Sequence, residues 1–406
     1  MKPLHNYVNN IVLEKEKHNA RKYFFYHHKL INNTRPITNS LLGGKLGLVL
    51  YYYSLYEAFH NKKDANKSIV LLKEVLSDLN KPYKLFGNSF GTGLTGLAYI
   101  INILVREGLL EINFGSALKK LDCSLYESAL QQINLHDSID YLHGALGVLH
   151  YFTKRLPNPV VSKYTLNLSL ALCSKAIEEK GGIWFRNYIM LEKEKEEINL
   201  SLAHGLSGIL LLMISAQEKM PMQPVIINTI EKGIDFLWSH YKKVDGFEQS
   251  KSCFPSIINS INRKNKRYSA RLAWCYGDLN IVMATYKAAC LLKKPHWTRE
   301  GTLLGAHTLT RMELTDIGAT DSHFCHGTTG LAQFYKKLFE ITGKPMYKNA
   351  WLYWIHKTLS LLPNENKRKL YAGKECNLLE GMVGVNLVLL SFISDNKLSW
   401  SESLLI

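Results

Sequence analysis

Cys325 and His326 stand side by side, directly ahead of a Gly-x-x-Gly step that begins at Gly327. A related step begins at Gly277, and Cys275 lies two residues before it, just as Cys325 lies two residues before Gly327. Two thiolates and one imidazole form a common ligand set for Zn²⁺, and three protein ligands leave a fourth position open. If the fold brings the two steps together, the residues predict one zinc ion per chain with room for a further ligand.

Core packing is the alternative for each of these residues taken singly, because lone cysteines in apolar helices are mostly small core residues. Core packing or a surface loop is the better interpretation of the other five, which are Cys123, Cys173, Cys253, Cys290 and Cys376. Seven widely spaced cysteines, an odd number, are not typical of a disulfide framework. The shared register is therefore what favours zinc at Cys275, Cys325 and His326.

Two histidines occupy the position just before a first glycine, His204 in "LAHGLSG" and His143 in "YLHGALG". A histidine exchanges its proton near neutral pH, so either could do acid–base work, and either could equally hydrogen-bond a loop. We favour the chemical role for His204 and leave His143 open. Asp140, four residues before a first glycine, could orient a histidine.

Two further polar residues flank the cysteine in "ARLAWCYG". Arg271 precedes Cys275 by four residues, and Tyr276 follows it directly. Both are candidate site residues because they share the expected level of the zinc ligands. An ordinary loop role is the alternative, and for Arg271 and Asp140 the residues alone slightly favour it.

The glycine step occurs seven times, with first glycines 49 to 72 residues apart, and this spacing indicates a repeat architecture. The first glycines are Gly44, Gly93, Gly144, Gly205, Gly277, Gly327 and Gly381. Each opens an apolar stretch of helical length, such as residues 205–216, and helices with one polar face lie between, such as residues 224–243. We expect an all-α fold, a double-layered α/α barrel (toroid) of seven inner and seven outer helices. An open α-solenoid is the structural alternative.

Two stretches interrupt the repeats, residues 181–200 and 245–270. Their aromatic, β-branched and charged residues predict loop insertions with short strands over one face of the barrel. No composition shift marks a domain boundary, so residues 1–406 are expected to form a single domain.

The chain is basic, with 50 Lys and Arg against 34 Asp and Glu. Its only dense cluster, "NRKNKR" at 262–267, has no interleaved aromatics, so nucleic acid is not an expected partner. This cluster could recruit an acidic partner, or it could be a solvated loop. The first residues have no apolar signal-peptide core, and no window reaches the ~18 apolar residues of a membrane span. A cytoplasmic location is expected.

With these motifs the chain resembles the lanthionine synthetase C proteins, the cyclases of lanthipeptide biosynthesis. The resemblance rests on "AWCYG" (273–277), "CHG" (325–327), "AHGLSG" (203–208) and "IDYLHGALG" (139–147), and the repeats extend it over nearly the whole chain. It implies zinc held by Cys275, Cys325 and His326. It also implies that the residues around the reaction are His204, Asp140, Arg271 and Tyr276.

The resemblance implies a reaction in which a peptide cysteine thiol, activated by zinc, adds to dehydroalanine or dehydrobutyrine. His204 would protonate the resulting enolate, Arg271 or Tyr276 would stabilise it, and Asp140 would orient the acid. The substrate would be a dehydrated precursor peptide made by a separate dehydratase. An ABC exporter is a further expected partner, and such a complex would hold the protein at the inner face of the membrane.

Four alternatives stay open on the sequence. A relative of the same family could bind glutathione or a peptide on zinc without cyclase activity. An α/α-barrel glycosidase would need paired carboxylates, and the register offers only Glu380 and Asp140. A prenyltransferase-like zinc barrel and a non-catalytic peptide-binding barrel are the others. Asn280 also departs from the family, which usually keeps a glycine there, so the backbone path of the fifth repeat is left undetermined.

Overall fold

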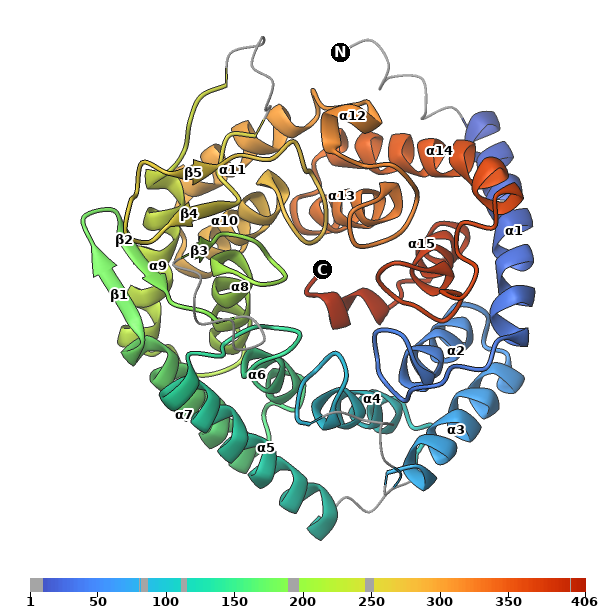
Figure 1. The fold of residues 1–406 in the computed structure, drawn as a ribbon, viewed down its shortest axis with the longest axis horizontal. Helices are drawn as coiled ribbons and strands as arrows, with labels where there is room; N and C mark the ends of the chain where they lie inside the picture. Colours follow the sequence, from blue (N-terminus) through green and yellow to red (C-terminus); the bar gives the residue numbers. More distant parts are fainter. Residues whose placement is uncertain are drawn as a thin grey trace. The chain divides into compact units, whose positions relative to one another are not determined.

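The computed structural model describes residues 10–79, 81, 87–110, 115–188, 197–244, 252–394 and 396–406. The chain divides into two compact units. Figure 1 shows the helices and strands of both units, coloured along the sequence. The terminal unit comprises residues Met1–Leu85 and Met312–Ile406, and the central unit comprises Phe86–Arg311.

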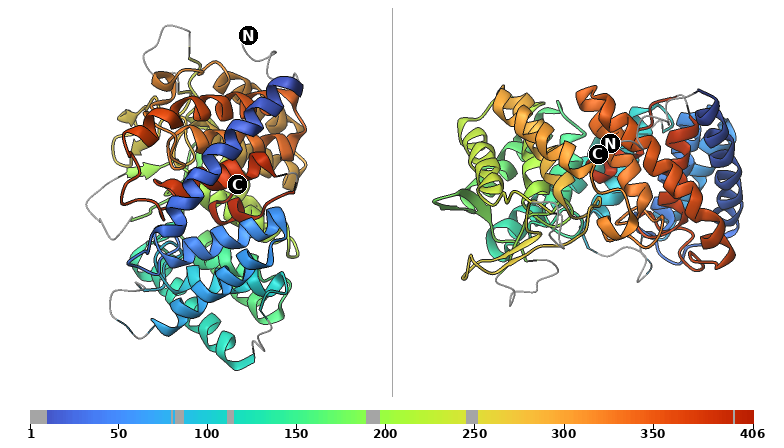
Figure 2. Two further views of the ribbon diagram at one scale, coloured as in Figure 1. Left: turned by 90° about the vertical axis from the view of Figure 1, so that its right-hand side faces the viewer. Right: turned by 90° about the horizontal axis from the view of Figure 1, so that it is seen from above.

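The terminal unit pairs helices from both ends of the chain. Its helices are α1 (Asn10–Asn33), α2 (Lys45–Phe59), α3 (Lys62–Ser77), α12 (Leu314–Ile317), α13 (Thr328–Thr342), α14 (Pro345–Lys367) and α15 (Met382–Ile393), with a 3₁₀ helix η3 (Trp400–Leu404). Helix α2 packs against α3, and α13 packs against α14. Helix α1 lies along α14 and α15 (Figure 2), so the first described helix packs against the last two α-helices.

The central unit continues the same pattern. Its helices are α4 (Leu94–Arg106), α5 (Gly115–His136), α6 (Leu146–Thr153), α7 (Pro159–Ser174), α8 (Leu206–Gln217), α9 (Pro224–Ser239), α10 (Asp278–Leu292) and α11 (Pro295–Thr308). Helix α6 packs against α7, α8 against α9, and α10 against α11. Helices α4, α6, α8 and α10 also pack in succession, each against the next.

Two kinds of helix explain this arrangement. All twelve residues of α15 are buried, whereas α9 buries one face, with Ile226, Ile230 and Ile234 fully covered, and exposes Val225 on the other. A helix that is apolar all round must be enclosed, and one with a polar face can cover it. In the part of the chain that the structure describes, seven helices follow a first glycine and seven covering helices alternate with them. The expected seven and seven helices are confirmed.

Glycines allow a close approach of the backbone where the buried helices begin. A Cβ on Gly47 would lie 2.6 Å from the carbonyl oxygen of Leu41, inside van der Waals contact. Only glycine lets the first turn of the helix approach the preceding segment so closely. The spacing of the glycines thus marks the helix starts.

The fifth repeat follows a different path, as the unusual Asn280 indicates. Gly277 has a φ of +122°, a conformation that favours glycine, whereas Gly205 is extended with a φ of −142°. Asn280 is fully buried, and its Nδ2 donates to the carbonyl oxygens of Ala273, at 3.3 Å, and Trp274, at 2.9 Å. Its Oδ1 accepts from the backbone N–H of Leu202 at 3.1 Å. Side-chain hydrogen bonds replace the close backbone approach made at the glycines.

Short strands form in the expected insertions 181–200 and 245–270, and one more, β1 (Ala176–Glu179), forms just before the first of them. Strands β1 and β2 (Gly182–Phe185) make an antiparallel hairpin, and β2 packs against α9. Strands β3 (Glu197–Asn199), β4 (Ile257–Asn259) and β5 (Lys266–Arg267) form an antiparallel sheet in the order β3-β4-β5. Residues 189–196 and 245–251 of these insertions lie outside the described residues. The expected single domain stays a prediction.

The basic stretch 262–267 is partly neutralised by its neighbours. Arg263 forms an ion pair with Glu179 at 2.7 Å and lies over the ring of Trp184, and Arg267 pairs with Glu197 at 3.1 Å. These pairs reduce the charge that the stretch offers to a partner.

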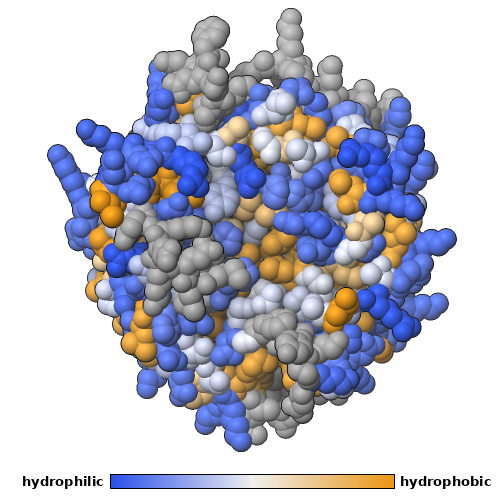
Figure 3. Space-filling view, viewed as in Figure 1, coloured by the Kyte–Doolittle hydropathy of each residue, from blue (hydrophilic) through white to orange (hydrophobic). Residues whose placement is uncertain are grey.

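On the face in Figure 3, polar side chains separate small apolar patches. None of the described helices combines the length and apolarity needed to cross a membrane.

Candidate functional site

Each buried helix is preceded by a tight turn, and five of the seven turns are closed by their own side chain. The side chain four residues before the first glycine accepts the backbone N–H three residues further on, at 2.8 to 3.2 Å. These acceptors are Ser40, Ser89, Asp140, Ser201 and Asn377. Such short polar side chains favour turns because they supply an acceptor for a backbone N–H that would otherwise lack one.

Asp140 does more than close its turn. Its Oδ1 accepts the backbone N–H groups of Leu142, at 2.9 Å, and His143, at 2.8 Å. Its Oδ2 binds Nδ1 of His204 at 2.7 Å, and the Asp140 side chain is fully buried. A serine in this position would have only one oxygen. The carboxylate therefore completes the third turn and also orients the histidine of the fourth.

His204 is fixed at three points. Its N–H donates to Ser201 Oγ, its carbonyl accepts from Asn187 Nδ2 at 2.8 Å, and its Nδ1 binds Asp140. Burial lowers the pKa of His204, but the hydrogen bond and charge of Asp140, with the charge of Cys275, raise it above its ordinary value overall. Because Nδ1 is occupied, Nε2 is the nitrogen left to exchange protons.

Two aromatic side chains flank His204. The His143 ring stacks nearly parallel to it, with centroids 6.2 Å apart, and burial lowers the pKa of His143. The Tyr276 ring lies 6.4 Å away, and its hydroxyl accepts from Asn199 Nδ2 at 2.9 Å. Burial raises the pKa of Tyr276, so its phenol is neutral at physiological pH and can donate a hydrogen bond. Asn187 and Asn199 come from the insertions and have no sequence motif.

Arg271 shares a small cavity with Tyr276. Its backbone N–H donates to Ser269 Oγ at 3.1 Å, and both Arg271 and Tyr276 line a cavity of about 10 Å³. The central unit thus gathers Asp140, His204 and Tyr276, with Arg271 adjoining the last of them.

Cys275 is almost completely buried in the same unit. Its carbonyl oxygen accepts from the N–H of Ala203 at 3.4 Å, which ties the turn of Cys275 to the turn of His204. This contact places the buried thiol of the fifth turn next to the histidine of the fourth. It explains why the charge of Cys275 acts on the pKa of His204.

Cys325 and His326 lie in the terminal unit. The Cys325 N–H donates to the carbonyl of Leu379 at 2.8 Å, and His326 Nδ1 is buried with no hydrogen-bond partner in the described part of the chain. A buried ring nitrogen left without a partner is costly unless a ligand occupies it. The residues therefore fit a metal ion. Because Cys275 belongs to the other unit, the complete set of three stays a prediction.

A second group of potential ligands lies wholly within the central unit. Ligand atoms of Cys253, Asp278 and His307 lie within 4.8 Å of one another. However, the fully buried Arg311 approaches Asp278 Oδ2 to 3.5 Å and already supplies a positive charge. Burial, reinforced by Asp278, raises the pKa of Cys253 to about 12, so its thiol stays protonated. We interpret this group as a structural ion-pair cluster.

With this geometry in place, comparisons with known proteins define the class. The family model of the lanthionine synthetase C-like proteins matches residues 35–405, and the chain belongs to that family. Among solved structures, nisin cyclase is similar over 96% of this chain and 97% of its own, with a TM-score of 0.73 and 19% sequence identity. The family expected from the motifs and the α/α toroid fold class are confirmed.

Proposed function

We propose that this protein is a zinc-dependent cyclase of lanthipeptide biosynthesis. It adds cysteine thiols of a dehydrated precursor peptide to dehydroalanine or dehydrobutyrine, which gives lanthionine or methyllanthionine thioether rings. The observation that carries the proposal is the Asp140–His204 pair in the turn that adjoins Cys275. Membership of the lanthionine synthetase C-like family and the likeness to nisin cyclase support it.

Cys275, Cys325 and His326 would hold the zinc ion. When bound, zinc favours the thiolate form of a substrate cysteine and keeps it in place for attack. The unpartnered Nδ1 of His326 supports its role as a ligand. In the cluster of Cys253, Asp278 and His307, Arg311 already neutralises the carboxylate of Asp278. This supports one zinc ion per chain rather than two.

His204 supplies the proton that completes the addition. The sulfur forms a bond to the β-carbon, the alkene electrons move toward the carbonyl as an enolate, and the α-carbon then takes a proton. Nε2 of His204 donates it, since Asp140 holds Nδ1, and the raised pKa of His204 increases the protonated fraction near neutral pH. The proton released from the substrate thiol balances the one consumed.

Tyr276 and Arg271 stabilise the enolate in this proposal. The neutral phenol of Tyr276, whose ring lies near His204, and the guanidinium of Arg271, which lines a cavity with Tyr276, would be the donors, because a donor aimed at developing negative charge stabilises it. Asp140 acts through His204 by fixing the orientation of its ring. A separate dehydratase would supply the substrate, and an exporter would place the protein at the inner face of the cytoplasmic membrane.

A ring-closure assay on a dehydrated peptide tests the proposal, with mass spectrometry after thiol alkylation to count open cysteines. We expect His204→Asn to keep one zinc ion but to close rings about 100-fold more slowly, the usual scale for losing a general acid. Cys325→Ala should lose zinc and activity together. His143→Asn, at the same position of the preceding repeat, is the matched control.

Two results would redirect the proposal. Wild-type ring-closure rates in His204→Asn would remove it from the reaction, and full zinc occupancy in Cys325→Ala would end the ligand assignment. If the zinc-loaded chain bound glutathione in a calorimetric titration and closed no rings, it would be a binding protein of the same family.

A further inference from the structure

Two of the seven turns lack the side-chain acceptor that closes the other five, and they are the turns that carry Cys275 and Cys325. Ala273 occupies the acceptor position in one, and His323 occupies it in the other. The Nδ1 of His323 is engaged by Asp321 Oδ1. Both turns must therefore be held by other groups.

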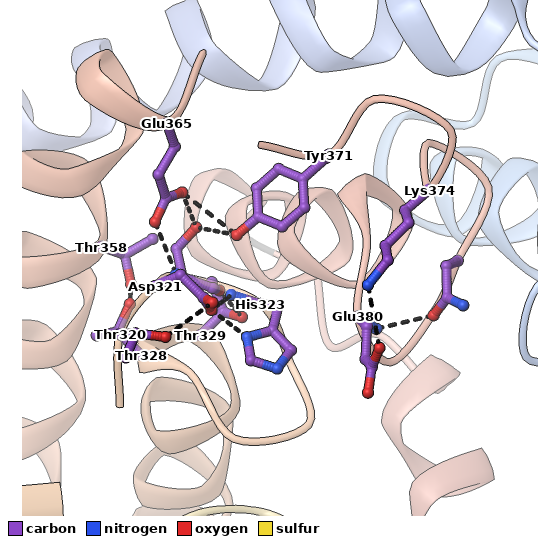
Figure 4. Close-up of polar contacts among 12 residues, drawn as sticks. Thr320, Asp321, His323, Thr328, Thr329, Thr358, Glu365, Tyr371, Lys374 and Glu380 are labelled. Atoms are coloured by element: carbon purple, nitrogen blue, oxygen red, sulfur yellow. Dashed lines mark hydrogen bonds and ion pairs between the residues drawn. The ribbon is translucent and has the colours of Figure 1, made fainter. Parts of the chain in front are cut away.

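A buried carboxylate on the covering helix α14 holds the turn of Cys325 (Figure 4). Glu365 is 6% exposed, and its Oε1 accepts the backbone N–H of Ser322 at 2.9 Å. Its Oε2 accepts from Ser322 Oγ and, at 3.3 Å, from the hydroxyl of Tyr371. The hydroxyls of Ser322 and Tyr371 are themselves 2.9 Å apart. Within the described chain, the hydrogen bonds found for the Glu365 carboxylate oxygens all come from these two residues.

The other side of the same turn is held as well. The carbonyl oxygen of Ser322 accepts from Thr329 Oγ1 at 2.6 Å, and the N–H of Thr328 donates to Asp321 O at 3.1 Å. Ser322 is therefore fixed through its N–H, its hydroxyl and its carbonyl, three residues before Cys325.

The residues on either side of Ser322, Asp321 and His323, connect this turn to the second proposed ligand, His326. Asp321 Oδ1 accepts the N–H of His323 at 3.1 Å and also binds its ring. The His323 ring in turn packs edge-on against the His326 ring, with centroids 4.0 Å apart at 84°. Because Ser322 lies between Asp321 and His323 in the chain, we expect a change at Ser322 to shift the His323 ring that packs against the His326 imidazole.

A buried carboxylate is costly unless its oxygens are hydrogen-bonded, so its presence on an apolar helix face calls for a role. We propose that Glu365 is a positioning residue for the metal ligands Cys325 and His326, which it holds in their ligating conformation before the metal arrives. This inference rests on the proposed zinc centre. Partners outside the ligand shell commonly change metal affinity by about 10- to 100-fold.

The test compares the zinc affinity of full-length variants by competition with a chromophoric chelator. We expect Glu365→Leu to bind zinc about 10-fold more weakly, and its Co²⁺ derivative to lose ligand-field intensity. Glu365→Gln keeps an acceptor for the Ser322 N–H and should restore most of the affinity. Gln333→Leu is the matched control, because it removes another buried side-chain hydrogen bond, from Gln333 to Ser401, on α13.

Amide hydrogen exchange in the metal-free proteins gives a readout independent of zinc. Glu365→Leu should accelerate exchange at Ser322 and Cys325, and Gln333→Leu should not. Unchanged zinc affinity in Glu365→Leu, or an equal loss in Gln333→Leu, would overturn the positioning role alone. A wild-type chain that takes up no zinc would overturn the proposed metal centre together with this role. If Glu365→Leu fails to fold, Ser322→Ala carries the same comparison, with a smaller loss of affinity expected.

Discussion

The turn that carries Cys275 and the turn that carries Cys325 are both held by a buried ion, but the two ions have opposite charge. In the central unit the guanidinium of Arg311 donates to the carbonyl of Ala270 and pairs with Asp278. In the terminal unit the carboxylate of Glu365 accepts from Ser322. The turn near Arg311 is held through a carbonyl oxygen, and the turn near Glu365 is held through an N–H and a hydroxyl.

Both ions come from the covering layer. Arg311 follows α11, and Glu365 lies near the end of α14. The other five turns close with their own Ser, Asp or Asn side chain. A turn whose side-chain positions serve another purpose can thus be held by a residue in, or just after, a covering helix.

The two turns differ further in how their helices begin. The Cys275 turn combines a positive φ at Gly277 with the three hydrogen bonds of Asn280, whereas Gly327 is extended with a φ of −104°. The Cys275 turn thus depends on a backbone conformation that favours glycine, which the Cys325 turn does not need. We expect it to be the more sensitive of the two to substitution.

The largest effect is expected at Arg311. Arg311→Met would leave the buried Asp278 carboxylate without its counter-ion, and breaking a buried pair costs about 3–5 kcal/mol. Chemical denaturation with urea measures the loss. Adding Asp278→Asn to this variant should recover much of the stability, because no uncompensated charge then remains. Equal stability of the wild type and Arg311→Met would contradict the role assigned to this ion.

A smaller effect is expected at Asn280. Asn280→Gly restores the residue type of the other repeats but removes the bonds to Ala273, Trp274 and Leu202, so it should lower the free energy of unfolding by about 2–3 kcal/mol. The same denaturation experiment tests this. A stabilised variant would mean that the fifth repeat can adopt the path of the others, which would remove this difference between the two turns.

The smallest effect is expected on the pH dependence of stability, through His240 in the central unit. Burial, and next the charge of Lys266, lower the pKa of His240 from 6.5 to about 4, with Glu179 opposing and Arg263 adding to the shift. Between these two values the unfolded chain binds a proton that the folded chain does not, so stability should fall as the pH falls through this window. His240→Gln should flatten that slope. An unchanged slope would show that other groups set the pH dependence.

The elements of the fold were predictable because their signals are local. The close approach at Gly47 admits only glycine, and a glycine recurs at this place in every repeat except the fifth, so these helix starts have a visible signature. The apolar run of residues 205–216 likewise predicts a buried helix. The pairing of Cys325 with His326 is local as well. By contrast, Arg311 and Glu365 contact turns 41 and 43 residues away in the chain, outside the repeat register. Asn187 and Asn199 contact the site from insertions that carry no motif, so periodicity could not identify them.

The two oxygens of Asp140 have a consequence for how such a site can arise. Five turns of one design accept serine, asparagine or aspartate at the same place, so an exchange among these residues preserves the turn. In one of the five, Asp140 has a second carboxylate oxygen that the turn does not need, and this oxygen binds Nδ1 of His204. In evolutionary terms, a repeated turn of this kind would let a single substitution add a chemical group without first disturbing the fold.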